Sequence, residues 1–172
     1  KTRPDIIKKV HASFLEAGAD IIETNTFGAN EVVLKEFGLE QKASELNLLG
    51  AQLARKTADE YSASGHCRCV AGSLGPGTKL PSLGQISFQQ LWRSYRAAIS
   101  GLLEGGVDFL LIETCQDPLQ AKTAVIAAHD QMSEQKIMVP VFVQVTMETT
   151  GTMLVGTDIE SLVATFSALG VD

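Results

Sequence analysis

A carboxylate follows the most apolar stretch of the chain. Residues 109–112 are all apolar, a glycine pair precedes them, and Glu113 follows directly. Such a run predicts a strand that is buried on both faces. A lone buried carboxylate costs several kcal/mol unless it is paired, hydrogen-bonded or protonated. Since parallel sheets wrapped by helices carry their chemistry at the C-terminal strand ends, Glu113 is the first candidate for a functional group.

Polar residues also follow two earlier apolar segments. Thr24 and Asn25 end the first segment, and Ser73 ends the second, just before a glycine turn. An asparagine both donates and accepts hydrogen bonds, which suits an amino-acid ligand; the alternative is a bond that only orders a loop. For Glu23 two interpretations stay open, a side chain that points into the interior or one that supports a neighbour.

The cysteines and histidines do not form an evident metal site. Residues 66–69 (His-Cys-Arg-Cys) lack a closed tetrahedral ligand set, and they precede their strand, at the end opposite the expected site. Cys115 lies near that site, and we interpret it as a free structural thiol. We therefore predict no metal ligand and name no catalytic residue. Three cysteines give no disulfide framework, and a reducing cytoplasm fits best.

One sequence motif, here called the recurring motif, is repeated along the chain and indicates the elements that position these residues. Residues 15–24 and 103–114 share a helix end, a glycine, an aspartate, an apolar strand and a final Glu-Thr. Residues 168–172 repeat the first part of this motif. This repeat predicts one βα unit used several times.

The hydrophobic pattern predicts four strands that alternate with helices, which implies an α/β class with a parallel sheet. The expected strands cover residues 20–25, 68–73, 107–113 and 139–147, and the main helices cover residues 2–17, 31–37, 41–62, 88–103, 117–132 and 159–168. An open doubly wound sheet and a (β/α)₈ barrel both fit. A barrel takes about 250 residues, so these 172 residues would supply part of one. The start within a helix and the end at a strand favour a piece of a longer protein.

Composition excludes several classes of protein. The chain is 45% hydrophobic and 20% charged, which is typical of a globular domain. A net charge of -6 without a lysine or arginine cluster argues against a nucleic-acid or anionic-membrane partner. No apolar run approaches the roughly 18 residues of a membrane span, and the N-terminus does not resemble a signal peptide.

Three motifs carry a resemblance to a known family. They are residues 18–27 (Gly-Ala-Asp-Ile-Ile-Glu-Thr-Asn-Thr-Phe), residues 72–76 (Gly-Ser-Leu-Gly-Pro) and residues 111–114 (Leu-Ile-Glu-Thr). The first is specific, whereas the second alone is weak. Over its whole length the chain resembles the homocysteine-binding domains of cobalamin-dependent methionine synthases, within the wider family of zinc-dependent homocysteine S-methyltransferases.

The resemblance implies a fold and cofactors. The family fold is a (β/α)₈ TIM barrel, so residues 1–172 would form a single incomplete homocysteine-binding barrel domain, with strands two to five and without the first strand and strands six to eight. Zinc in this family lowers the pKa of the homocysteine thiol, so that the thiolate attacks the methyl group. Its ligands are three cysteines in Gly-x-Asn-Cys and Gly-Gly-Cys-Cys segments, which lie outside this chain.

The resemblance also implies roles and partners. Glu113 matches the glutamate that contacts the substrate amino group, and Thr24, Asn25 and Ser73 would lie near homocysteine. The parent protein would use methylcobalamin, with cobalamin and folate domains as partners, although betaine and S-methylmethionine stay open as methyl donors. We expect the fragment alone to be inactive. The alternatives are a non-catalytic scaffold fragment and another TIM-barrel enzyme, such as a pterin-binding methyltransferase.

Overall fold

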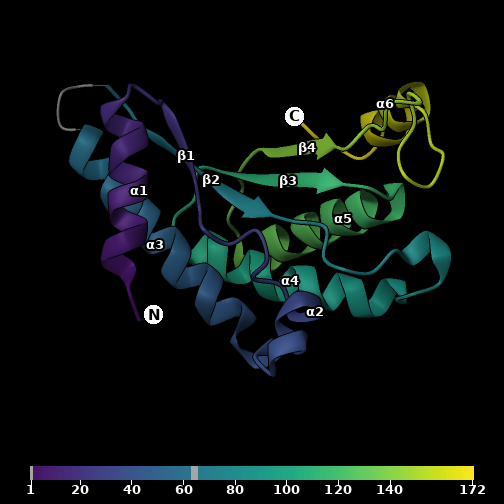
Figure 1. The fold of residues 1–172 in the computed structure, drawn as a ribbon, viewed down its shortest axis with the longest axis horizontal. Coiled ribbons are helices and arrows are strands. Elements are labelled where there is room, and N and C mark those ends of the chain that lie inside the picture. The colour runs from purple at the N-terminus through teal and green to yellow at the C-terminus, as the bar shows by residue number, and fades with distance from the viewer. Residues whose placement is uncertain (1, 63–65) are drawn as a thin grey trace.

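A four-stranded parallel sheet organises the part of the chain that the structure, a computed structural model, describes, namely residues 2–62 and 66–172 (Figure 1). The strands lie in the order β1-β2-β3-β4. Their bounds are β1 (Ile21–Glu23), β2 (Cys69–Leu74), β3 (Phe109–Cys115) and β4 (Val141–Val145). The predicted α/β class with a parallel sheet is therefore confirmed.

Helices connect successive strands and cover one face of the sheet. Within the described ranges they are α1 (Pro4–Glu16), α2 (Glu31–Leu34), α3 (Ala43–Ser62), α4 (Phe88–Glu104), α5 (Pro118–Gln135) and α6 (Ile159–Ser167), with short 3₁₀ turns at Lys35–Phe37, Glu40–Lys42 and Pro81–Leu83. Figure 1 shows α3, α4 and α5 side by side beneath the sheet, with α1 beside the β1 edge. No described helix has the length and apolar character that a membrane crossing needs.

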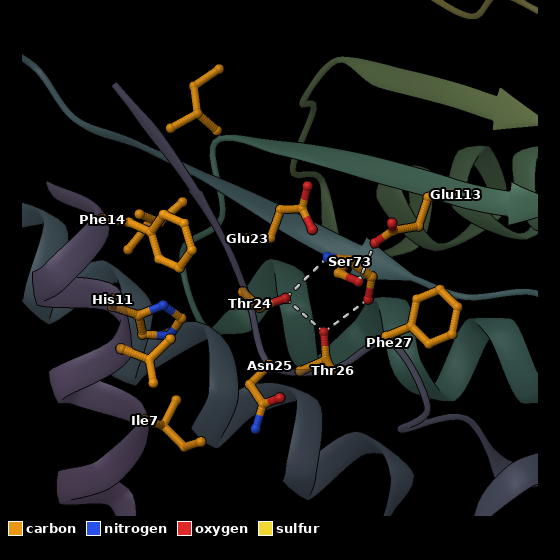
Figure 2. Close-up of a pocket in the computed structure, with 13 residues that line it drawn as sticks. Ile7, His11, Phe14, Glu23, Thr24, Asn25, Thr26, Phe27, Ser73 and Glu113 are labelled. Carbon is orange, nitrogen blue, oxygen red and sulfur yellow. Dashed lines mark hydrogen bonds between the residues drawn. The ribbon is translucent and has the colours of Figure 1, made fainter. Parts of the chain in front are cut away.

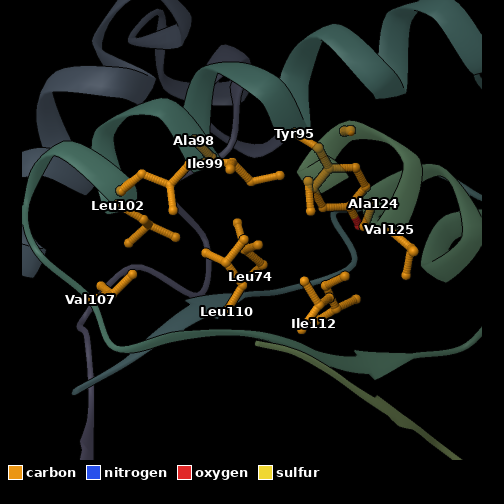
Figure 3. Packing of buried hydrophobic residues seen from close by; sticks show 14 of the residues in the cluster. Leu74, Tyr95, Ala98, Ile99, Leu102, Val107, Leu110, Ile112, Ala124 and Val125 are labelled. Atoms are coloured by element: carbon orange, nitrogen blue, oxygen red, sulfur yellow. The ribbon is translucent and has the colours of Figure 1, made fainter. Parts of the chain in front are cut away.

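The core lies between the sheet and these helices. Leu110 and Ile112 of β3 point from the strand toward α4 and α5, where Ile99, Leu102 and Val125 meet them (Figure 3). All five side chains are fully buried. Burial of each such side chain contributes roughly 1.5–3 kcal/mol, so this layer fixes the strands that carry the candidate site.

The opposite face of the sheet is more open. Ile21 of β1 is 51% exposed and Phe142 of β4 is 40% exposed. Phe142 packs edge-on against Phe109 of the neighbouring strand, with ring centroids 5.1 Å apart. Successive strand residues alternate between faces, so this open face is also the one that presents the polar side chains of the site.

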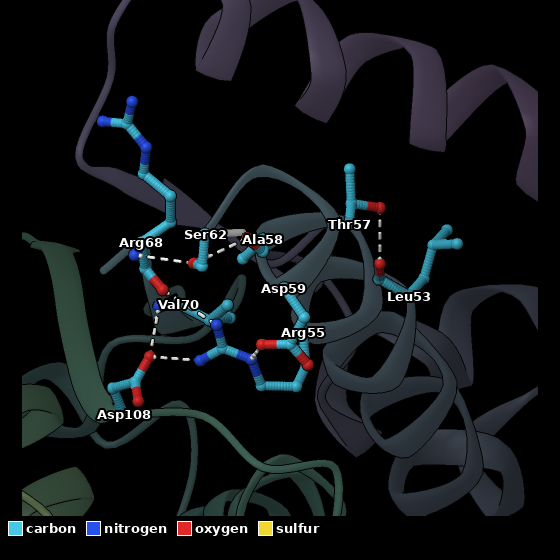
Figure 4. Close-up of polar contacts among 9 residues, drawn as sticks. All are labelled: Leu53, Arg55, Thr57, Ala58, Asp59, Ser62, Arg68, Val70 and Asp108. Carbon is cyan, nitrogen blue, oxygen red and sulfur yellow. Dashed lines mark hydrogen bonds and ion pairs between the residues drawn. The ribbon is translucent and has the colours of Figure 1, made fainter. Parts of the chain in front are cut away.

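The aspartate of the recurring motif binds the backbone of the neighbouring strand. The Asp108 backbone N–H donates to Val70 O at 2.9 Å, and Val70 N–H donates back to Asp108 Oδ2 at 2.6 Å (Figure 4). Arg55 adds an ion pair of 2.7 Å to the same carboxylate oxygen. Asp172 makes the same two bonds with Val141, at 2.9 and 3.0 Å. Asp108 thus sets the register between β2 and β3, and Asp172 binds β4 in the same way.

The glycines of the recurring motif have a left-handed backbone conformation. Gly18, Gly106 and Gly170 follow α1, α4 and α6 with φ of +101°, +82° and +65°. Glycine adopts this conformation without the steric cost of a side chain and commonly ends helices. The predicted glycine stop is confirmed, and it returns the chain to the sheet just before each aspartate.

Candidate functional site

The residues that the sequence singled out line one pocket of about 540 Å³ beside β1 and α1. Thr24, Asn25, Ser73 and Glu113 all contribute to its wall, together with Glu23 (Figure 2). They come from the C-terminal ends of three neighbouring strands. The structure therefore brings together side chains that are as much as 90 residues apart along the chain.

Ser73 and Glu113 form the shortest polar link in this pocket. The Ser73 hydroxyl donates to Glu113 Oε1 at 2.5 Å. Hydroxyl donors bind an ionised carboxylate at this distance, and such bonds are about twice as strong as neutral ones. Ser73 is 2% exposed, whereas Glu113 is only partly buried. The bond therefore holds a carboxylate whose other oxygen still faces the pocket.

A closed ring of three hydrogen bonds fixes Ser73. Thr26 Oγ1 donates to Ser73 O at 2.8 Å, and Ser73 N–H donates to Thr24 Oγ1 at 3.0 Å. The two threonine oxygens lie 2.6 Å apart. Because the Thr26 proton goes to Ser73 O, Thr24 is the donor in the third bond. The hydroxyl of Thr24, a residue predicted to lie near substrate, thus forms hydrogen bonds within the protein and positions Ser73.

An irregularity at the end of β3 aims Glu113. The pairing of β3 with β4 shifts register between Ile112 and Cys115. Thr114, directly after Glu113, has a φ of +59°. A β-branched residue in this region is strained, and such strain persists where the surrounding structure imposes it. The bulge turns the strand end so that Glu113 stays on the open face while Cys115 is buried.

Glu23 is a second carboxylate in the pocket. Partial burial, with a smaller contribution from the charge of Glu113, raises the pKa of Glu23 above its usual range. Among residues 2–62 and 66–172, no lysine, arginine or histidine forms an ion pair with Glu23 or Glu113. Among the described residues, the two carboxyl groups therefore have no cationic partner in an ion pair.

Asn25 lines the pocket but lies apart from the central pair. Its side chain is exposed. Figure 2 shows its amide pointing away from Ser73 and Glu113. Its contact with a substrate stays a prediction.

The described residues do not fit a zinc site. Within the described ranges, no three or more side chains among His, Cys, Asp and Glu gather as metal ligands. Burial, with help from nearby carboxylates, raises the pKa of the Cys115 thiol to about 12. Cys67 and Cys69 lie at the other end of their strand, and His66 instead contacts Asp20 at 2.6 Å. The thiolates that zinc prefers are thus not supplied at this pocket.

Comparison with known proteins gives a family and close relatives. The family model described as homocysteine S-methyltransferase matches residues 1–172. The chain is 45% identical over 172 residues to a methionine synthase from Mycobacterium leprae (strain TN) and 44% identical to one from Mycobacterium tuberculosis (strain ATCC 25618 / H37Rv). These alignments cover all of this chain but 14% of each relative.

Solved structures show the same fold. The metallated form of the homocysteine methyltransferase MmuM from Escherichia coli superposes with a TM-score of 0.79 over 96% of this chain and 60% of that one, at 23% identity. Its apo form gives a TM-score of 0.75 and also 23% identity.

Proposed function

Because this chain belongs to the homocysteine S-methyltransferase family, we propose that it is part of the homocysteine-binding domain of a methionine-synthase-type protein, here termed the parent protein. That protein would transfer a methyl group to the thiolate of homocysteine and form methionine. The match of the whole chain to the mycobacterial methionine synthases carries this proposal. The pair of carboxyl groups in the pocket at the strand ends supports it, because homocysteine carries an ammonium group.

The described residues would hold the amino-acid end of homocysteine. An ammonium group has three donors and no acceptor, like that of lysine. The free oxygen of Glu113 accepts one of these bonds, and Ser73 Oγ, whose own proton goes to Glu113, has lone pairs left for another. Thr24 and Thr26 keep Ser73 in place. An ammonium–carboxylate pair of this kind is a charge-assisted hydrogen bond, which is stronger than a neutral one.

The metal would come from elsewhere in the parent protein. Since the described residues do not fit zinc, we propose that cysteines outside these 172 residues bind it and that the chain alone is inactive. We propose methylcobalamin as the methyl donor, supplied by cobalamin and folate domains. The three cysteines are free in the structure, and we propose a reducing cytoplasm as the location.

We further propose that residues 1–172 are one part of a (β/α)₈ barrel whose first strand and strands six to eight lie outside them. The bonds between Asp172 and Val141 repeat those of Asp108 with Val70, so a further strand would pair with β4 at that position. On the other side, His11 of α1 is 6% exposed, and its Nε2 has no hydrogen-bond partner among the described residues. A strand paired with the free edge of β1 would pass next to α1 and supply one, since strand–helix–strand crossovers bring parallel strands together.

The coding sequence and an assay test this function. We expect Gly-x-Asn-Cys within about ten residues after Asp172 and Gly-Gly-Cys-Cys further on, which would complete a three-thiolate zinc site. The parent protein should then methylate homocysteine, with an activity that zinc chelation removes. Absence of both cysteine segments, or a parent protein that does not methylate homocysteine, would overturn the proposal.

A further inference from the structure

Glu23 lies on the same face of the sheet as Ser73. In the pairing of β1 with β2, Glu23 is in register with Ala71, two residues before Ser73. Residues in register on parallel strands point to the same face, and so do residues two apart on one strand. Figure 2 shows the carboxylates of Glu23 and Glu113 on either side of Ser73.

No described side chain supplies a proton or a positive charge that would separate the carboxylates of Glu23 and Glu113. Ser73 donates its one hydroxyl proton to Glu113, so it has none for Glu23. Burial lowers the pKa of His11, the titratable side chain that α1 adds to the same pocket, which disfavours its cationic form. Two like charges near one another disfavour ionisation unless a cation lies between them.

A substrate ammonium would meet three acceptors at this place. Glu113 offers its free carboxylate oxygen, Ser73 offers Oγ, and Glu23 offers a carboxylate from the opposite side. This set matches the three N–H donors of an ammonium group.

We infer that Glu23 is a second carboxylate for the substrate ammonium, and that with Glu113 it makes the site selective for thiols that carry an α-amino group. This inference rests on the proposed function and adds a residue to it. Glu23 would bind and discriminate substrate, and would take no part in methyl transfer itself.

Steady-state kinetics of the parent protein test this inference with two substrates. They are homocysteine and 4-mercaptobutanoate, which is homocysteine without its amino group. For Glu23→Gln we expect the KM for homocysteine to rise about tenfold or more, as for a lost hydrogen bond to a charged group, with kcat changed less than about twofold. The KM for 4-mercaptobutanoate should stay constant or fall. Glu160→Gln, which alters an exposed carboxylate on α6, is the control and should match wild type with both substrates.

The other outcomes separate the two proposals. If wild type methylates homocysteine and Glu23→Gln leaves its KM unchanged, or raises the KM of both thiols equally, the inference about Glu23 is wrong while the function stands. If wild type does not methylate homocysteine, the function fails and the inference fails with it. Should Glu23→Gln not fold, Glu23→Asp keeps the charge but shortens the side chain, and a homocysteine KM equal to wild type would then contradict the role.

Discussion

The hydroxyl of Ser73 lies 2.5 Å from Oε1 of Glu113 and ties the C-terminal end of β2 to that of β3. Ser73 in turn is held by Thr24 and Thr26 through its own backbone. The orientation of the carboxylate therefore depends on a loop after β1, a strand away from β3. A side chain fixed in this way loses little conformational freedom when a ligand binds to it.

Removal of the Ser73 hydroxyl should weaken substrate binding more than folding. In the parent protein, Ser73→Ala deletes one bond to Glu113 and one acceptor for the ammonium, so we expect the KM for homocysteine to rise about tenfold. Ser161→Ala, at an exposed serine of α6, is the matched control. An unchanged KM in Ser73→Ala would show that the bond does not orient Glu113 for binding.

Asp108, the aspartate of the recurring motif, should contribute to the stability of the fold. Asp108→Ala leaves Val70 N–H without its side-chain acceptor and removes the ion pair with Arg55. We expect a loss of about 1–2 kcal/mol in the free energy of unfolding, measured by urea denaturation followed by circular dichroism. Asp59→Ala removes a more exposed partner of the same arginine, 63% exposed, and should cost about 0.5 kcal/mol or less. Equal losses in both variants would contradict a register role for Asp108.

Glu23 should make stability depend on pH. Burial and the charge of Glu113 raise the pKa of Glu23 in the folded state, whereas a glutamate in the unfolded chain titrates near 4.3. Below that pH both states hold the proton, so the carboxyl group costs nothing. Between that pH and the raised pKa the unfolded state loses its proton while the folded state keeps it, so the folded state loses relative stability as the pH rises through this window.

The variant Glu23→Gln therefore should melt at a higher temperature than wild type at pH 7. The difference should shrink as the pH falls below about 4.3. Thermal melts between pH 3.5 and pH 8, followed by circular dichroism, measure this difference directly. A difference in melting temperature that is the same at every pH would show that the charge of Glu23 is not its cause.

The cysteines should differ in reactivity. The Cys115 thiol is buried, and its pKa of about 12 leaves almost no thiolate at pH 8. Cys67 is exposed. Iodoacetamide at pH 8, followed by mass spectrometry, should modify Cys67 in the native protein and Cys115 only after denaturation. Native labelling of Cys115 at the rate of Cys67 would contradict its burial.

The sequence predicts the framework of this fold because local patterns specify it. The strand predicted at residues 107–113 is observed as Phe109–Cys115, and that at 139–147 as Val141–Val145. Apolar runs locate strands, whereas their ends depend on pairing with neighbours. The first strand, predicted to reach residue 25, stops at Glu23 because the chain turns at Thr24, whose carbonyl accepts from Thr26 N–H at 2.9 Å.

The site is predictable only in part. Glu113 and Ser73 stand out because a polar residue ends each apolar run. Thr26 was missed, since its role depends on a bond to Ser73, 47 residues away. The left-handed Thr114 has no sequence signal either, because such conformations are expected at glycine or asparagine. Local sequence patterns do not predict the conformation or partners of a residue when distant parts of the chain determine them.

The KM for homocysteine of the parent protein with Glu113→Gln tests the central claim most directly. The claim is that Glu113 pairs with the substrate ammonium, so this KM should rise about 10- to 100-fold, as for a lost hydrogen bond to a charged group, while the KM for 4-mercaptobutanoate should not rise. Glu160→Gln should match wild type. A Glu113→Gln protein that keeps the wild-type KM for homocysteine would contradict the claim.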